Sequence, residues 1–369
     1  MNKKSSIWAL ALAGLAAGGA AQAQSVTIYG VLDGAVEYLD NVGAAGASLT
    51  RMPGLTGGMV PSRLGFRGSE DLGGGLKANF TLEQGFGVDA GTLNQGGRAW
   101  GRQVFVGLSG DWGALTLGRQ YSMLFWSQTE ADILGPAMFG SGSLDSYLPN
   151  ARVDNAIAYR GTFSGFTIGA TFSPGRDSVN AGPSPSGTNC AGENAADKSA
   201  CQQWSILAKY DTASWGASAA IDELTGGPGA FAGLTSSALK DRRSTVTGWF
   251  RPMAALKLGA GLISRDNEGS ATTPRSDLWY LGATYTLTPQ ITLDAEVFRI
   301  DYKNSANAAN LFALRGVYNL SKRTAAYATV GQINNDGTLA ASVSNAAAGG
   351  APAAGQTQTG FGAGIRHSF

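Results

Sequence analysis

The stretch Gly360-Phe361-Gly362-Ala363-Gly364-Ile365-Arg366-His367-Ser368-Phe369 alternates between two kinds of side chain. One set, at a period of two, is mostly apolar: Phe361, Ala363, Ile365, His367 and Phe369. The other set is small or polar: Gly360, Gly362, Gly364, Arg366 and Ser368. Because successive side chains of a β-strand point to opposite faces, this pattern predicts a strand with one apolar and one small or polar face.

The same alternation recurs along the chain, in segments 76–83, 166–173, 256–262 and 291–297. In each of them Leu, Ile, Phe, Val or Ala occupies every second position, and Lys, Asn, Thr, Ser, Gly, Asp or Glu lies between. No helical period of 3.6 competes over a comparable length. Strands of about ten residues with one apolar and one polar face are typical of a β-barrel that crosses a membrane.

The connections between these strands are alternately short and long. The short ones are 70–75, 110–114, 161–165, 211–214, 252–255, 287–290 and 320–324. The long ones are 40–61, 87–99, 120–152, 173–202, 222–244, 266–276, 303–310 and 334–357. Seven short and eight long connections make fifteen, which predicts an all-β, sixteen-stranded antiparallel transmembrane β-barrel. Its edges must pair, because bilayer hydrocarbon offers no partner to a free backbone group, and a barrel of this size encloses water.

The first residues have the three parts of a secretory leader. Lys3 and Lys4 are followed by the apolar stretch 7–17 and by Ala21-Gln22-Ala23, a typical cleavage site. The sequence therefore predicts a signal peptide at 1–23 and the barrel at 24–369.

Composition narrows the functions that the chain can have. The net charge is +1, with no basic excess that would favour nucleic acid as a partner. No cofactor or metal site is predicted. Cys190 and Cys201 fall in one long connection, and in an oxidising compartment such a pair predicts a disulfide rather than a reactive or metal-binding pair.

Four segments carry a resemblance to a known family: 26–33, 62–72, 102–108 and 117–121. They are similar to the first strands of the trimeric general-diffusion porins of β-proteobacteria such as Bordetella, Burkholderia and Neisseria. A closing strand that ends in Phe369 resembles the same class. The resemblance implies a homotrimer in the outer membrane, surrounded by lipid, which passes ions and small hydrophilic solutes. It also implies that the third long connection, 120–152, folds into the lumen.

Matching these motifs suggests the residues of a pore constriction. Arg63, Arg102 and Arg152 fall where the family places a row of arginines on the wall, and Arg67 shares a face with Arg63. The alternation of apolar and polar residues supports inward placement of Arg63 and Arg67. It supports Arg102 poorly, because Arg102 falls on the same face as Val104 and Val106. The alternative is that these arginines are scattered lumen charges.

The resemblance places two acids of connection 120–152, Asp132 and Glu130, opposite the arginines. Ala137-Met138 stands where enteric relatives carry a further acid. Three or more arginines against one or two acids predict a preference for anions, because rings of charge set ion selectivity.

Passive diffusion is therefore the expected function. A substrate-specific outer-membrane channel is the main alternative. A barrel enzyme would need a general base, most often histidine, and the single histidine, His367, lies in the closing strand. An adhesin with a plugged lumen fits poorly with sixteen strands and no insert large enough to fill them.

Overall fold

Sixteen long strands form one continuous wall in the computed structural model, which describes residues 25–176, 190 and 192–369. The expected leader, 1–23, lies outside the described residues. The wall strands are β1 Ser25–Val42, β3 Arg63–Gly73, β4 Leu76–Gly85, β5 Gln103–Gly110, β6 Gly113–Tyr121, β8 Ile157–Phe163, β9 Phe166–Ser173, β10 Gln203–Asp211, β11 Trp215–Thr225, β12 Lys240–Met253, β13 Leu256–Asn267, β14 Arg275–Thr286, β15 Ile291–Tyr302, β16 Ala308–Asn319, β17 Thr324–Asp336 and β18 Thr357–Ser368. Two short strands add to them, β2 Ala47–Arg51 and β7 Arg152–Val153.

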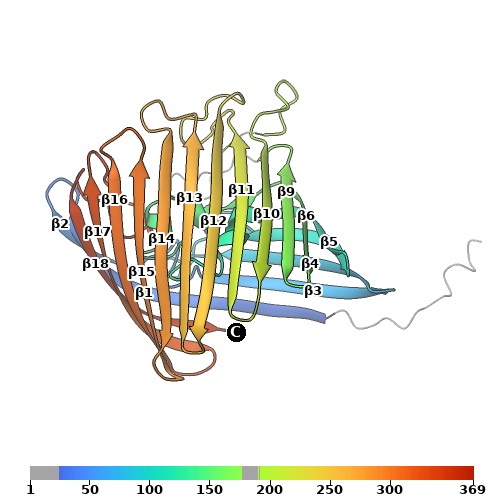
Figure 1. Cartoon of the computed structure of the whole chain (residues 1–369), viewed down its shortest axis with the longest axis horizontal. Helices are drawn as coiled ribbons and strands as arrows, with labels where there is room; N and C mark the ends of the chain where they lie inside the picture. The colour runs from blue at the N-terminus through green and yellow to red at the C-terminus, as the bar shows by residue number, and fades with distance from the viewer. Residues whose placement is uncertain (1–24, 177–189, 191) are drawn as a thin grey trace, which may run out of the picture.

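The wall closes on itself (Figure 1). Each long strand is antiparallel to its neighbours, and β1 pairs with β3 on one side and with β18 on the other. The backbones of Gly30 and Phe369 exchange two hydrogen bonds of 3.1 Å at this seam. A closed barrel leaves no free sheet edge, which is the condition for crossing hydrocarbon with strands. The predicted sixteen-stranded antiparallel barrel is confirmed.

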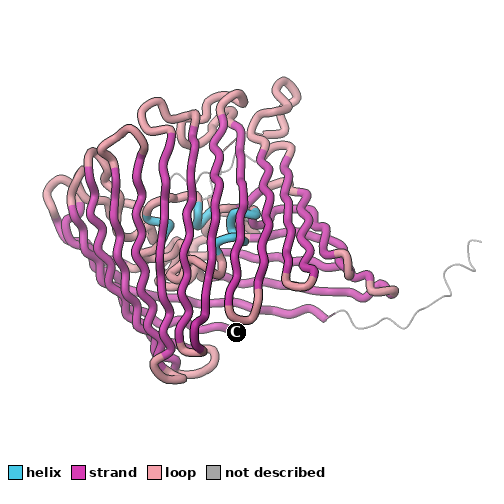
Figure 2. The backbone as a smooth tube through the Cα atoms, viewed as in Figure 1, coloured by secondary structure: helices cyan, strands magenta, loops and turns pink. Residues whose placement is uncertain are grey.

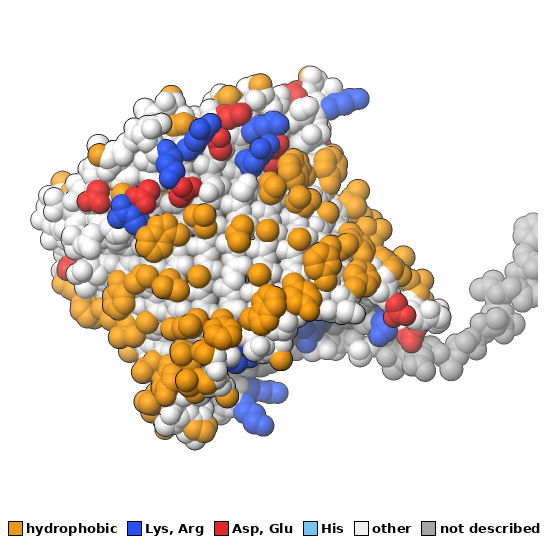
Figure 3. All heavy atoms as spheres, in the orientation of Figure 1, with side chains coloured by type: hydrophobic (Ala, Val, Ile, Leu, Met, Phe, Trp, Pro, Cys, Tyr) orange, Lys and Arg blue, Asp and Glu red, His pale blue; other side chains and the backbone are white. Residues whose placement is uncertain are grey.

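Apolar side chains point outwards from this wall. In β9, Phe166, Ile168 and Phe172 are exposed, whereas Thr167 and Thr171 are buried inside. Figure 3 shows that the outward apolar side chains form a band, with charged side chains above and below it. This is the division that a lipid-facing surface requires.

Aromatic residues lie towards the ends of the strands, as in the interfacial belts of membrane barrels. Tyr210, Trp215, Tyr285 and Tyr318 are exposed on the outside. Tyr327 differs from these residues, because it is buried inside, where its hydroxyl donates to Asp33 Oδ1. A polar partner in the lumen holds this ring on the inner face.

The third long connection, 122–156, enters the barrel, as expected (Figure 2). We call it the inward loop. It contains α2 Met123–Gln128, the short helices η1 Ser141–Ser143 and η2 Leu148–Asn150, and strand β7. In the described part of the chain, no helix has the length and the apolar character to cross a membrane.

Candidate functional site

The first limb of the inward loop is fixed to the wall at strands β10 to β12. Met123 N donates to Ser205 Oγ at 2.9 Å, where α2 begins. Where α2 ends, the carbonyl of Ser127 accepts hydrogen bonds from Ser218 Oγ at 3.1 Å and Thr247 Oγ1 at 2.8 Å. Hydroxyl side chains on the lumen face of the barrel thus satisfy the backbone groups that a short helix leaves unpaired at its ends.

The next segment of the loop is held by a carboxylate of the wall. Glu296 of β15 accepts hydrogen bonds from Ile133 N at 3.2 Å and from Leu134 N at 2.7 Å. Asp132, beside them, accepts from Gly135 N at 2.8 Å and from Ser141 Oγ at 2.6 Å. Burial raises the pKa of Asp132 to about 6.

The tip of the loop reaches the opposite wall. Phe139 lies against Gly331 of β17 and Gly360 of β18, where an added Cβ would come within 2.9 Å and 2.7 Å of its ring. The last long connection, 337–356, covers the tip from outside, and Ser143 Oγ donates to its Val343 O at 2.8 Å. The inward loop therefore crosses the whole lumen.

The returning limb is anchored by a buried ion pair. Arg243 of β12 donates from Nε to Asp145 Oδ2 at 2.7 Å, and its side chain is 1% exposed. Its guanidinium also lies over the ring of Tyr147, with Cζ 4.5 Å from the centroid. Burial alone would raise the pKa of Asp145, but Arg243 and Arg265 hold that pKa below its usual value. The loop is thus fixed on both limbs and at its tip.

The predicted arginines Arg63, Arg102 and Arg152 lie together around Glu83 and Tyr121. Arg102 Nε donates to Glu83 Oε1 at 2.7 Å, and Arg63 Nε lies 3.7 Å from Glu83 Oε2. The hydroxyl of Tyr121 accepts from Arg102 Nη2 at 2.6 Å and from Arg152 Nη2 at 3.1 Å. We call these five residues the arginine cluster.

Arg67 lies one step away from the arginine cluster. Its Cζ is 5.3 Å from the ring centroid of Tyr29, and the Tyr29 hydroxyl donates to Glu83 Oε2 at 3.0 Å. Arg67 and Arg63 share the inner face of β3, because Leu64 and Phe66 take the outer face.

The two predicted acids of the loop lie elsewhere. Asp132 is buried against Ser141 and Glu296. Glu130 is exposed and pairs with Lys257 of β13 at 2.7 Å. Among the hydrogen bonds and ion pairs of the described residues, neither acid joins Arg63, Arg102 or Arg152, so the structure does not bring these acids to the arginines.

Glu83 and Tyr121 are central residues that the sequence reasoning did not assign to the constriction. In the alternating pattern of segment 76–83, Glu83 occupies a polar position, and this pattern predicts that its side chain faces the lumen. The alternating pattern does not predict the direction of the Arg102 side chain, because β5 begins only at Gln103. The backbone of Arg102 lies next to β4, where Arg102 N donates to Glu83 O at 3.1 Å. The alternation of a strand does not apply to a residue that precedes it.

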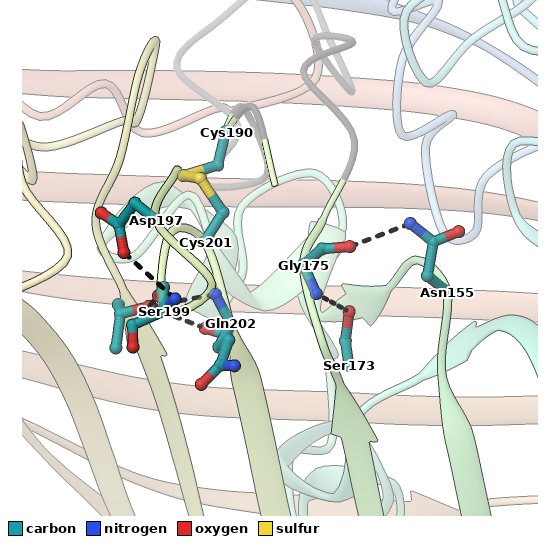
Figure 4. The surroundings of a disulfide bond; sticks show 9 residues. Asn155, Ser173, Gly175, Cys190, Asp197, Ser199, Cys201 and Gln202 are labelled. Atoms are coloured by element: carbon teal, nitrogen blue, oxygen red, sulfur yellow. Dashed lines mark hydrogen bonds between the residues drawn. A yellow bond between two sulfur atoms is a disulfide. The ribbon is translucent and has the colours of Figure 1, made fainter. Parts of the chain in front are cut away.

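The fourth long connection carries a disulfide between Cys190 and Cys201, with Cα atoms 5.5 Å apart (Figure 4). Both cysteines are buried. Cys201 N donates to Gly226 O at 2.9 Å, which ties this connection to the next one. At its base, Asn155 Nδ2 donates to Gly175 O at 2.9 Å. The disulfide therefore lies in a loop that is joined to both of its neighbours.

Comparison with known proteins agrees with this architecture. The model of the Gram-negative porin family matches residues 9–338. Outer membrane porin protein 32 of Delftia acidovorans is 33% identical over 98% of this chain and 99% of its own. An outer membrane porin of Bordetella pertussis is 38% identical over 46% of this chain and 48% of its own.

Solved structures show the same fold. The anion-selective porin from Comamonas acidovorans superimposes with a TM-score of 0.71 at 26% identity, covering 94% of this chain and 100% of that one. OmpT of Vibrio cholerae in its trimer form has a TM-score of 0.63 at 16% identity, covering 94% and 99% of the two chains. Full-length sequence similarity, the closed barrel and its inward loop agree, and the chain belongs to the Gram-negative porin family.

Proposed function

We propose that this outer-membrane porin passes ions and small hydrophilic solutes by passive diffusion, and that it favours anions. The observation that carries the anion preference is the arginine cluster, which holds three guanidinium groups and one carboxylate: Arg63 and Arg102 contact Glu83, and Arg152 shares the Tyr121 hydroxyl with Arg102. Arginine remains protonated in proteins. The Comamonas acidovorans porin, which is described as anion-selective, supports the same sign of charge.

The loop acids do not offset this positive charge directly. Asp132 is engaged by Gly135, Ser141 and Glu296, and Glu130 is paired with Lys257. The constriction residues proposed for the anion path are therefore Arg63, Arg102 and Arg152, with Arg67 at its edge. Asp132 and Glu130 act on the path from a distance.

The test is the reversal potential of the purified protein in a planar lipid bilayer under a KCl gradient. An anion-sided potential with stable conductance steps is the expected result. A reversal potential on the cation side would overturn the proposed anion preference, but the proposed channel function would still stand. Folded protein without conductance would overturn the diffusion function itself.

We also infer that three copies associate through the wall of β5 to β9. β5, β8 and β9 have 8, 7 and 8 residues, below the about 9–11 that a tilted membrane strand needs, and β6 with 9 residues lies at the lower limit. A groove between β4 and β6, at the edge of this wall, has a lining that includes Phe80, Leu82, Trp100, Val106 and Leu117, together with Arg98, Arg119, Asp154 and Asn155. A short, grooved wall is better covered by a second copy than by lipid, and the Vibrio cholerae OmpT trimer supports this assembly. Light scattering in detergent would measure the mass, and a monomer would overturn the inference.

Lipid is the proposed partner of the remaining outer wall, and catalysis is not part of the proposed function. The single histidine, His367, forms a 2.9 Å hydrogen bond through Nδ1 with Thr324 Oγ1, between β17 and the closing strand. The imidazole ring of His367 therefore links two neighbouring strands of the barrel wall.

A further inference from the structure

A pocket of about 310 Å³ lies in the wall of the lumen, where inward-facing residues of β4, β5, β6 and β8 meet helix α2 of the inward loop. We call it the wall pocket. Ala114 and Ala158 contribute only methyl groups to its lining. The strand register also places Gly107, which has no side chain, between Asn79 and Thr116. Small residues therefore leave room in the wall, and the volume is at the lower end of the range for ligand pockets, about 300–1,000 Å³.

The cation of the wall pocket is Arg160. It shares the inner face of β8 with Ala158, which is buried, whereas Ile157 is exposed on the outside. Its Cζ lies 3.7 Å from the ring centroid of Trp126. A guanidinium that stacks on an aromatic ring still presents its planar fork of N–H donors, which matches the two oxygens of a carboxylate.

Arg160 has no anionic partner within the protein. None of the hydrogen bonds and ion pairs among the described residues involves its guanidinium, and its side chain is exposed to the lumen. By contrast, Arg63 and Arg102 of the arginine cluster both contact Glu83. Arg160 is therefore a charged donor that a solute can reach and that no carboxylate of the described chain neutralises.

Uncharged polar side chains line the rest of the wall pocket. Asn79 Nδ2 donates to Ser109 Oγ at 2.6 Å, and Thr116 Oγ1 donates to Gln120 Oε1 at 2.7 Å. These bonds leave the Asn79 carbonyl oxygen and the Thr116 hydroxyl oxygen as acceptors. The carboxamide of Gln103, in the same lining, takes part in no hydrogen bond among the described residues. Hydroxyl groups of a solute can pair with such groups, whereas an apolar solute would leave them unpaired.

The wall pocket follows the arginine cluster along the pore. Tyr121, a member of the cluster, is part of its lining. Arg160 lies nearer to the short turns, because it pairs with Ala114 directly after the start of β6. Short turns of outer-membrane barrels are periplasmic. An anion that has passed the cluster on its way into the cell therefore meets Arg160 next.

We propose that the wall pocket is a binding site for small hydroxylated carboxylates, on the periplasmic side of the constriction. The carboxylate binds Arg160, and the hydroxyl groups bind Asn79, Thr116 and Gln103. This inference rests on the proposed anion path and names the solute class that the path retains. A second positive site also helps an anion to leave the first, because conduction requires binding that is shared among sites and weak enough to release.

Three solutes with six-membered rings test the proposal. Glucuronate has a carboxylate and hydroxyl groups, cyclohexanecarboxylate has only the carboxylate, and glucose has only the hydroxyl groups. Each is added to a planar bilayer that holds the intact porin in KCl, and the block of the chloride current is measured. Glucuronate is expected to block at a concentration about tenfold lower than either of the others, the factor that one or two additional hydrogen bonds supply.

Variants locate the site. Arg160→Gln is expected to weaken the block by glucuronate about tenfold and to bring it close to that by glucose. Lys209→Gln is the matched control and is expected to preserve the block. Lys209 shares the inner face of β10 with Leu207, but it pairs with Asp211 at 3.0 Å. Thr116→Val keeps the shape of the side chain and removes its hydroxyl, so it should weaken the block by glucuronate and not that by cyclohexanecarboxylate. This variant also supplies the test if Arg160→Gln does not fold.

Equal block by glucuronate and cyclohexanecarboxylate in the native porin would overturn the proposal. A block by glucuronate that Arg160→Gln leaves unchanged, or that Lys209→Gln weakens by the same factor, would overturn it as well. Failure of the anion path itself would appear separately, as a cation-sided reversal potential in KCl alone.

Discussion

Glu83 and Arg102 form a buried ion pair on the wall of the lumen, with Arg102 Nε 2.7 Å from Glu83 Oε1. Both side chains are 6% exposed. Glu83 also receives the Tyr29 hydroxyl and lies 3.7 Å from Arg63. One carboxylate thus positions two arginines while it cancels part of their charge. This double role determines what substitution of Glu83 does to selectivity.

Glu83→Gln is expected to make the pore more anion-selective. The glutamine keeps a hydrogen-bond acceptor for Arg102 but removes the negative charge. A unit charge a few ångströms from a permeating ion in a wet site changes its free energy by about 1 kcal/mol, or about fivefold in the permeability ratio. The measurement is the KCl reversal potential. A potential that moves towards the cation side would contradict this account of Glu83.

Arg102→Gln is the converse change and is expected to lower the anion preference by a similar factor. It leaves Glu83 with Arg63 and Tyr29 as partners and adds no charge of its own. Arg242→Gln is the matched control, because Arg242 is 52% exposed at the outer end of β12, where it pairs with Glu223. A reversal potential that changes equally in both variants would show that general surface charge, and not the arginine cluster, sets selectivity.

Acidification is expected to strengthen the anion preference between about pH 7 and pH 5. Burial raises the pKa of Asp132 to about 6. Above that pH the ionised carboxylate adds a negative charge that acts on the anion path from a distance, and below it the charge is lost, so anions pass more readily as the pH falls. The charged or titratable groups that act on Asp132 are Glu296, Arg315 and Tyr280. Asp132→Asn keeps the size of the side chain and should flatten this pH dependence of the reversal potential. An unchanged slope in that variant would assign the titration to another group.

The barrel was predictable because lipid imposes a strict rule on each strand. Every second side chain must be apolar, as in Phe166, Ile168 and Phe172, and the connections must alternate in length. The lumen has no comparable rule, since water accepts any polar side chain. The hydrogen bonds of Asp132 with Ser141 and Glu296 therefore correspond to no pattern in the neighbouring sequence. Tyr327 faces inwards for a similar reason, because its partner Asp33 is 294 residues away.

The ion pair between Arg243 and Asp145 is expected to hold the returning limb of the inward loop in place. Asp145→Ala leaves Arg243 with Asp241 as its ion-pair partner, 3.0 Å from Arg243 Nη1, so the expected cost lies below that of a buried charge that loses its sole partner, which is about 3–5 kcal/mol. Asp145→Ala should therefore loosen the loop, which would appear as larger fluctuations of the open-channel current and a lower unfolding temperature. Current noise that matches the native porin would show that the other anchors suffice.

The glycines opposite the loop tip are expected to tolerate no side chain. A Cβ at Gly331 would lie 2.9 Å from Phe139 Cγ and 3.0 Å from a methyl carbon of Val343. Gly331→Ala should therefore push the tip of the inward loop into the lumen and lower the single-channel conductance. Gly316→Ala is the matched control, because its Cβ would meet no atom of the described residues closer than 3.8 Å. Equal conductance in the two variants would mean that the tip shifts along the wall without narrowing the pore, and the close packing of Phe139 on Gly331 would then have no part in setting the pore size.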